Sequence, residues 1–255
     1  MKTIIGTKIG MTSLFDVKGK SIPVTIIRCE PNKVLEVKAS NNLANKDAYK
    51  VGYESKDEKK LSKPKAGIFK KVESEGKQFI QTIYEDQQYN VGDEISVNIF
   101  EKGEYVDVQG LTRGRGYSGA IVRWNFKIGP MSHGHGYPHR WQGSIAMGRG
   151  GSQKQAVPKG KKMAGQYGHE TVTIQNLVIV DVDTEKNLIL VQGGIPGPAG
   201  SIVTIHTAVK KPEAKLNYDL VTKSKQVEIE KANEAAEDKS AIHNEAVAEA
   251  KAEKK

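Results

Sequence analysis

Residues 172–193 read VTIQNLVIVDVDTEKNLILVQG, two runs of alternating apolar and polar side chains that are joined by the turn residues DTEKN. Alternation with a period of two places one face of a strand in a core, and a short polar turn between two such runs is typical of a β-hairpin. Aspartate and asparagine favour turns because their side chains bond to the nearby backbone. We therefore expect an antiparallel hairpin here, within a larger β structure.

Strand-like runs lie on both sides of this hairpin. SIVTIHTAV follows it at residues 201–209, and near the start of the chain SLFD and IPVTIIRC flank a turn at residues 16–20, where Gly19 can take a positive φ. Four more runs are KVLEVK (33–38), QFIQTIY (78–84), EISVNIF (94–100) and YVDVQG (105–110). So many short strands predict a mainly β fold that closes into a barrel. The lysine-rich polar stretch at about 40–71 predicts a small subdomain or a long excursion.

Between the strands, residues 109–169 contain no Asp or Glu. These 61 residues hold ten Lys or Arg, four of the six His and fourteen of the 26 Gly, and about seven carboxylates would fall there at the chain's average acidic frequency. A carboxylate beside phosphates suffers both repulsion and desolvation, so this exclusion predicts a polyanionic partner. The alternative is a flexible basic loop with no dedicated partner.

The chain as a whole supports the same class of partner. Its 255 residues carry a formal net charge of +9. Nucleic acid is favoured over an anionic membrane, because the sequence has no apolar span and no basic amphipathic helix. The first residues, MKTIIGTKIGMTS, lack the apolar run and cleavage site of a signal peptide, so we expect a soluble protein of the cytoplasm. The single Cys29 lies in the apolar run VTIIRC and is expected to be a buried strand residue.

The first of three basic clusters is RGRGY at residues 113–117, followed by RWNFK at residues 123–127. Glycine lets the backbone approach phosphates, arginine pairs with their oxygens, and aromatic faces stack on unpaired bases. This interleaving favours RNA. An alternative for Trp124 and Phe126 is a place in a core, at strand spacing.

The second cluster is HGHGYPHRW at residues 133–141, whose three histidines could meet a zinc ion. No cysteine or nearby carboxylate completes a ligand set, so we expect no metal. We interpret the imidazoles as groups that stack on bases or donate to phosphates.

The third cluster, KGKKMAGQ at residues 159–166, lacks the earlier glycine of a phosphate-binding P-loop and has Lys162 where Ser or Thr would hold magnesium. GRGG at residues 148–151 does not open a helix after a strand, so no dinucleotide cofactor is expected. No nucleophile stands beside an evident base and orienting acid. We expect no catalysis, no cofactor and no small-molecule substrate. The rival hypothesis is an enzyme that cleaves or modifies RNA with the histidines.

Several long motifs, taken in order, resemble one family. They are KIGMTSLFD and IPVTIIRCEPNKVL near the start, VDVQGLTRGRGYSGAIVRWNF in the middle, GPMSHGHGYPHR with GSI, and KGKKMAGQYGHETVTIQNLVIVDVDTEKNLILVQGGIPGPAGS, over roughly residues 4–209. Together they resemble the bacterial ribosomal protein L3 family of the large ribosomal subunit.

That resemblance implies a translation-factor-like β-barrel with a small α/β insertion and a long basic, Gly-rich extension. It also implies that the extension passes through ribosomal RNA towards the peptidyl transferase region and that the protein acts early in subunit assembly. The expected partners are large-subunit ribosomal RNA and neighbouring large-subunit proteins, in a ribosome-bound protein of the cytoplasm.

The sequence departs from the family at the tip of the extension. AMGRGGSQKQAVP (146–158) stands where relatives usually carry a shorter stretch that ends in a PGRVF-like run, and Trp141 and Gln142 stand where a small or apolar residue and Pro are common. Some bacterial relatives carry a methylated glutamine in this region, for which Gln153 and Gln155 compete.

We accordingly expect a barrel core from residues 1–108 and 170–212, with an insertion at about 40–90, and an RNA-penetrating extension at 109–169. Residues 213–255, with eight Lys and ten acidic residues, are expected to be a peripheral or mobile tail. The side chains expected to contact RNA are Arg113, Arg115, Arg123, Trp124, Lys127, His133, His135, His139, Arg140, Trp141, Arg149, Gln153, Lys154, Lys159, Lys161 and Lys162.

Overall fold

The structure is a computed structural model that describes residues 1–38, 47–86, 88–136, 139–145 and 157–211. The expected tail at 213–255 therefore lies outside the described residues. Strands dominate the elements that are described, so the prediction of a mainly β fold is confirmed.

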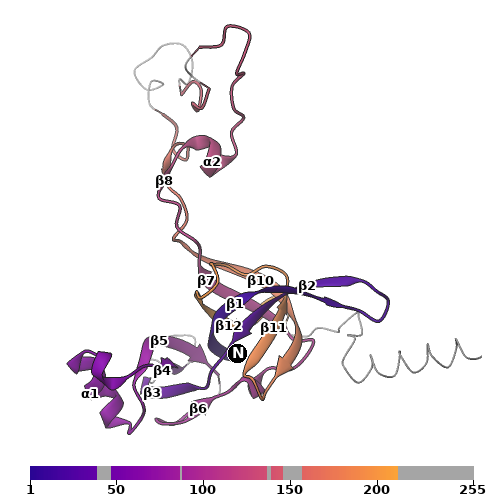
Figure 1. The fold of residues 1–255 in the computed structure, drawn as a ribbon. Helices are drawn as coiled ribbons and strands as arrows, with labels where there is room; N and C mark the ends of the chain where they lie inside the picture. The colour runs from indigo at the N-terminus through magenta and orange to yellow at the C-terminus, as the bar shows by residue number, and fades with distance from the viewer. Residues whose placement is uncertain (39–46, 87, 137–138, 146–156, 212–255) are drawn as a thin grey trace, which may run out of the picture.

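A closed barrel forms the centre of the molecule (Figure 1). Its neighbouring strands are antiparallel, and every second side chain points inward. Ile4, Ile27, Val108, Ile179 and Ile205 are fully buried in its core. Cys29 is buried there too, as expected, and burial raises the pKa of its thiol. In spatial order the strands are β1 (Thr3–Phe15), β12 (Ile202–Thr207), β7 (Tyr105–Leu111), β10 (Thr171–Asp183), β11 (Leu188–Gln192) and β2 (Ser21–Arg28).

Both hairpins expected from the sequence are present. Between β10 and β11, the carboxylate of Asp183 accepts hydrogen bonds of 3.1 Å from the backbone N–H groups of Glu185 and Lys186. Between β1 and β2, the N–H of Asp16 donates to the carbonyl oxygen of Lys20, and Gly19 has a φ of +77°. The two predicted hairpins are therefore confirmed, each closed by its turn residues.

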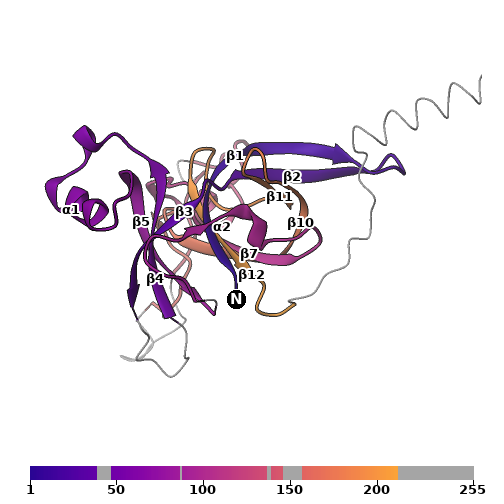
Figure 2. The same cartoon turned by 90° about the horizontal axis from the view of Figure 1, so that it is seen from below.

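A second sheet lies beside the barrel, in the order β5 (Lys77–Glu85), β4 (Asp47–Ser55), β3 (Asn32–Lys38) and β6 (Glu94–Ile95) (Figure 2). The helix α1 (Lys63–Lys71) and the 3₁₀ turns η1 (Glu58–Lys60) and η2 (Val97–Ile99) complete this region. The sheet begins before and ends after the expected insertion at about 40–90. Asn32 pairs with Ile95, and alternation alone does not tell which of two sheets a strand joins.

Strand β1 joins the barrel to the second sheet. The backbone N–H of Thr3 donates a hydrogen bond of 2.8 Å to the carboxylate of Glu85, and the hydroxyl of Tyr53 donates one of 2.9 Å to the carbonyl oxygen of Arg28. Burial raises the pKa of Glu85 to about 7, although hydrogen bonds from Thr3 and Tyr89 oppose the shift. The two sheets thus share a buried polar seam.

The acid-free segment projects from one end of the barrel (Figure 1). It leaves after β7 ends at Leu111 and returns where β10 begins at Thr171. Its own short elements are β8 (Tyr117–Ser118), α2 (Ala120–Trp124) and β9 (Gly165–Gln166). These limits fall within two residues of the acid-free run at 109–169.

Candidate nucleic-acid interface

The root of the extension is a two-stranded ribbon. The N–H of Thr112 donates to the carbonyl oxygen of Glu170 (2.9 Å), and further along the N–H of Arg115 donates to the carbonyl oxygen of Tyr167 (2.8 Å). The pairing of β8 with β9 continues the same ladder. Because cross-strand bonds tie both chains together, the ribbon holds its basic side chains at a fixed distance from the barrel.

Gly168 permits the two strands of the ribbon to approach each other closely. It has a φ of +70°, and a Cβ atom at this position would lie 2.1 Å from the carbonyl oxygen of Arg113. No other residue type fits both the positive φ and this contact. The glycine content of the segment therefore has a structural role here, in addition to any approach to phosphates.

At the far end of the ribbon, α2 is fastened to the returning strand. The indole Nε1 of Trp124 donates a hydrogen bond of 2.8 Å to the carbonyl oxygen of Met163, and Arg123 Nη1 donates one of 3.2 Å to the same oxygen. The first and third basic clusters, far apart in the sequence, thus meet. Trp124 is 37% exposed at the end of a helix, so its alternative place as a core residue at strand spacing is wrong.

Cations lie over the aromatic rings of the ribbon. The guanidinium of Arg115 is 5.4 Å from the ring centroid of Tyr167, and that of Arg123 is 4.9 Å from the ring of Trp124. The ammonium of Lys162 lies 5.7 Å from the same ring. These contacts concentrate positive charge beside the half-buried ring of Tyr167 and the exposed ring of Trp124, and basic residues interleaved with aromatic rings are typical of sites for single-stranded nucleic acid.

The histidine cluster forms a turn of its own beyond α2. The Nδ1 of His139 is 2.7 Å from the carbonyl oxygen of Pro130, and the rings of His135 and His139 lie 5.6 Å apart. Among the described residues, no group of three His, Cys, Asp or Glu side chains is arranged to hold a metal ion. The imidazole of His133 is exposed, whereas those of His135 and His139 are half-buried within the turn.

A cavity of about 530 Å³ opens between this turn and the segment that follows α2. Its lining includes Asn125, Phe126, Lys127, His135, Trp141 and Gln142. Aromatic, amide and cationic side chains from the first and second clusters therefore face one space.

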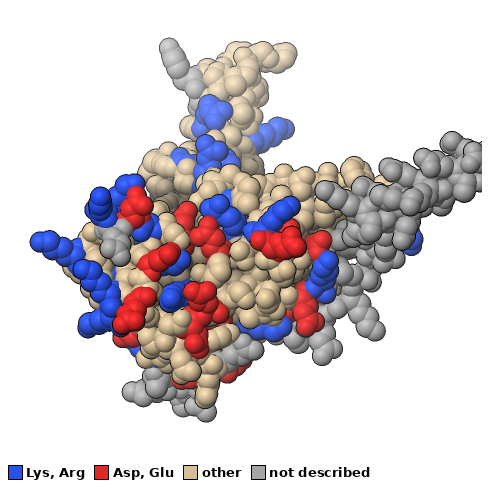
Figure 3. Space-filling view, turned by 60° about the horizontal axis from the view of Figure 1, so that its bottom comes forward, with Lys and Arg blue, Asp and Glu red and all other residues tan. Residues whose placement is uncertain are grey.

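The predicted contact residues in the described ranges all lie on the extension, and most are exposed. Arg113, Arg115, Trp124, Lys127, His133, Arg140, Trp141, Lys159, Lys161 and Lys162 are exposed, whereas Arg123, His135 and His139 are half-buried. Arg149, Gln153, Lys154 and the second methylation candidate, Gln155, lie outside the described residues. Figure 3 shows blue side chains without red ones on the extension, while both signs mix over the barrel and the second sheet.

A second group of exposed cations was not predicted from the sequence to contact RNA. Lys59, Lys63, Lys65, Lys70 and Lys71 are exposed on η1 and α1. The lysine-rich composition at about 40–71 was the signal that could have pointed to them. Acidic residues interrupt that stretch, so the exclusion of one sign of charge does not single out these lysines.

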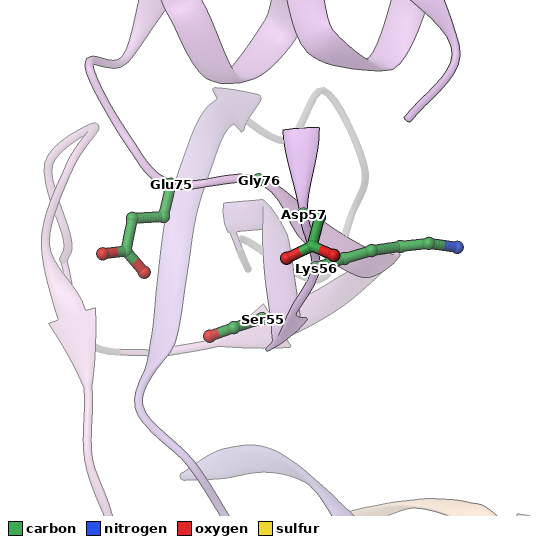
Figure 4. Close-up of a pocket in the computed structure, with 5 residues that line it drawn as sticks. All are labelled: Ser55, Lys56, Asp57, Glu75 and Gly76. Carbon is green, nitrogen blue, oxygen red and sulfur yellow. The ribbon is translucent and has the colours of Figure 1, made fainter. Parts of the chain in front are cut away.

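A smaller cavity of about 310 Å³ lies beside α1, lined by Ser55, Lys56, Asp57, Glu75 and Gly76. Figure 4 shows that the charged ends of Lys56 and Glu75 point to opposite sides rather than towards one centre. Its charges are mixed and do not converge, so it is a weaker candidate for an anionic ligand than the extension.

Comparison with known proteins agrees with the resemblance seen in the sequence. Residues 57–188 match the family Ribosomal protein L3. The chain is 48% identical over 226 residues to the large ribosomal subunit protein uL3 of Mycoplasmoides gallisepticum, an alignment that covers 88% of this chain and 95% of the relative. It is 46% identical to the uL3 protein of Mycoplasma pneumoniae, covering 92% of this chain and 80% of the relative, and 43% identical to that of Finegoldia magna, covering 82% and 99%. No helix in the described ranges is long and apolar enough to span a membrane.

Proposed function

Because the chain belongs to the ribosomal protein L3 family, we propose that it binds large-subunit ribosomal RNA through its acid-free extension and helps that RNA to fold during assembly. It is a ribosomal protein of the large subunit and serves translation as part of a ribonucleoprotein. The expectation of a ribosome-bound protein agrees with this membership.

The charge of the extension, compared with that of the barrel, is the main support for this proposal. A segment of 61 residues (109–169), whose sequence has ten Lys or Arg and no Asp or Glu, leaves the barrel on an antiparallel ribbon, whereas the barrel surface carries both signs of charge. A projecting arm with one sign of charge can enter a space lined by phosphates, where a mixed surface would be repelled. We propose residues 109–169 as this RNA-binding unit, the barrel and the second sheet as its base, and 213–255 as a peripheral tail.

The exposed cations have different expected roles. Arg113 and Arg115 at the root can pair with phosphate oxygens in a bidentate manner, whereas Lys159 and Lys161 act as point charges. The lysines of α1 are a second candidate contact with phosphates, on the surface nearer the barrel. Exposed Trp124 and Trp141 offer faces on which unpaired bases stack.

We further propose that the tip of the extension lies close to the peptidyl transferase region and tunes its geometry. The tip, between about residues 141 and 157, falls largely outside the described residues, as do both glutamines considered for methylation. Support for this step comes from the family alone. The apolar side chains Ile9, Met11 and Phe15, exposed on β1, are candidates for contact with neighbouring large-subunit proteins.

The rival hypothesis, an enzyme that acts on RNA with its histidines, has less support. The family is one of structural proteins. The imidazole of His139 is engaged with the carbonyl oxygen of Pro130, and the sequence of the extension offers no carboxylate to orient a histidine base.

Incubation of the full-length protein with labelled large-subunit RNA, with and without a chelator, separates the two hypotheses. The proposal expects stoichiometric binding that a chelator does not change and RNA that stays intact. Cleavage or modification of the RNA with turnover would instead establish the enzyme. A failure to bind this RNA above the level of an unrelated RNA at the same salt concentration would contradict the proposed function.

A further inference from the structure

The cavity of about 530 Å³ beyond α2 has the size of a ligand site. Its lining comes from residues 125–143, a segment that lies beyond α2, on the side away from the barrel in Figure 1. The sequence of the whole extension contains no acid, so no carboxylate of the extension neutralises Lys127, the cation in the cavity lining. An electron-rich, uncharged or anionic group is the ligand that such a cavity favours.

Two aromatic side chains form part of its wall. Trp141 is 63% exposed and Phe126 is half-buried, and they come from segments on either side of the histidine turn. An exposed indole offers a large apolar face to water, and such a face is a favourable platform for a flat ring. The wall therefore fits a planar ligand better than a bare phosphate.

Polar groups on the same wall match the edge of a nucleobase. The Nε2 of His135 is buried and has no hydrogen-bond partner within the described part of the chain. A buried polar atom without a partner is costly, so this nitrogen favours a ligand that can bond to it. Lys127 can donate to the O6 and N7 atoms of guanine, and Asn125 or Gln142 can pair with adenine.

We propose that this cavity captures a single unstacked purine of large-subunit RNA, which stacks on Trp141 and bonds to Nε2 of His135. The inference rests on the proposed RNA-binding function and adds to it a defined base-binding site. Phosphates on either side of the captured base would lie near Lys127 and Arg140, both of which are exposed.

Chemical probing of protein-free large-subunit RNA tests the proposal. The full-length protein is added at a concentration well above its dissociation constant. Dimethyl sulfate and kethoxal then report the base edges, and hydroxyl radicals report the sugars. We expect at least one unpaired purine whose base is protected by the wild-type protein and becomes reactive with W141A and with H135A, while the sugar protections remain. W141F should restore the protection because it retains a stacking face.

Tyr117 supplies the matched control. It is an aromatic residue on the same extension, 81% exposed, and it does not line the cavity. Y117A should leave that purine protected, whereas W141A should weaken binding to the RNA by roughly 5- to 150-fold, the range for loss of one stacked base.

The possible outcomes distinguish failure of the base-binding site from failure of the RNA-binding function. If the wild type protects the RNA but no purine loses its protection in W141A, the base-binding site is overturned and the RNA-binding function is not. The same holds if Y117A exposes the same purine as W141A. Failure of the wild-type protein to protect the RNA at all would overturn the proposed function.

Discussion

The indole Nε1 of Trp124 lies 2.8 Å from the carbonyl oxygen of Met163, to which it donates a hydrogen bond. Together with the hydrogen bond from Arg123 to the same oxygen, this contact joins the outgoing and returning halves of the extension beyond the β8–β9 pair. It explains how a segment with little apolar surface can hold a defined shape near its middle.

Loss of this bond should loosen the ribbon without unfolding the barrel. In W124F the ring remains, but the donor to Met163 is gone, and one hydrogen bond is worth about 1 kcal/mol. We expect amide exchange at Arg115 and Tyr167 to rise about fivefold, because these residues form the neighbouring rungs of the ladder. W141F is the control, since Trp141 makes no such bond to the ribbon; equal exchange in both variants would show that Trp124 does not fasten α2.

Two glycines with positive φ allow a test of the close approach between the two strands at the root of the extension. In G168A the new Cβ would lie 2.1 Å from the carbonyl oxygen of Arg113, whereas in G160A, at a φ of +78°, it would meet nothing within 4 Å. Both variants bear the backbone cost of about 1–2 kcal/mol, but only G168A bears the clash. We expect G168A to lose protection of the ribbon amides and to bind RNA more weakly than G160A does, with equal thermal unfolding of the barrel. The same loss in both would mean that backbone strain alone, and not the close approach, limits this position.

The sequence indicated the barrel well and the arrangement of the extension poorly. Inward side chains such as Ile179 and Ile205 follow the period of two, so their burial can be read from alternation. Alternation does not tell which of the two sheets a strand joins. The pattern around Asn32 would fit either sheet, and its pairing with Ile95 depends on contacts between residues that are distant in the sequence.

The same dependence on contacts between distant residues limited how much of the candidate site could be predicted from the sequence. Charge exclusion located the contact residues on one segment, but the bond of Trp124 to Met163 and the cavity beside His135 arise from tertiary geometry. A residue pattern contains no signal for an unsatisfied nitrogen. The lysines of α1 were missed because acidic residues nearby in the sequence make the composition of this stretch mixed in charge.

The buried Glu85 predicts a pH-dependent stability. Its pKa is about 7 in the folded protein, above the ordinary value of 4.5, because burial disfavours the carboxylate. The folded state therefore binds the proton more tightly, and stability is greatest at low pH and falls as pH rises from about 5 to about 7. The facing groups are the N–H of Thr3 and the hydroxyl of Tyr89, with the N-terminal amine and Asp86 nearby.

E85Q keeps the oxygen that accepts from Thr3 but cannot ionise. We expect it to exceed the wild type in free energy of unfolding at pH 8 by on the order of 2 kcal/mol and to lose this advantage at pH 5. Denaturant unfolding at both pH values measures the difference, and the effects of other titrating groups, such as the half-buried His206, cancel because both proteins share them. A constant difference between the two proteins at both pH values would show that Glu85 does not titrate in this range.

Exposed Lys161 and Lys162 predict a change in the salt dependence of RNA binding. Each phosphate contact contributes roughly −0.7 to −0.9 to the slope of log affinity against log salt, so K161A with K162A should flatten the slope by about one to two units. Filter binding over a range of salt concentrations measures it. The control, K18A with K20A, removes two exposed lysines from the turn of the β1–β2 hairpin and should leave the slope unchanged. An unchanged slope in the first variant would mean that these lysines face solvent in the complex.

The central claim is that the charge of the extension seats the protein in the large subunit, and a sedimentation gradient of a cell lysate tests it most directly. The test variant is full-length protein with Arg113, Arg115, Lys159 and Lys161 changed to Gln, all of them exposed on the extension. Its control carries Gln at Lys18, Lys20, Lys186 and Lys210, which are equally exposed on the barrel and its turns. We expect the wild type and the control to travel with the large subunit and the extension variant to remain largely at the top of the gradient. Co-sedimentation of the extension variant at the level of the control, with the folded barrel intact in both, would contradict the account.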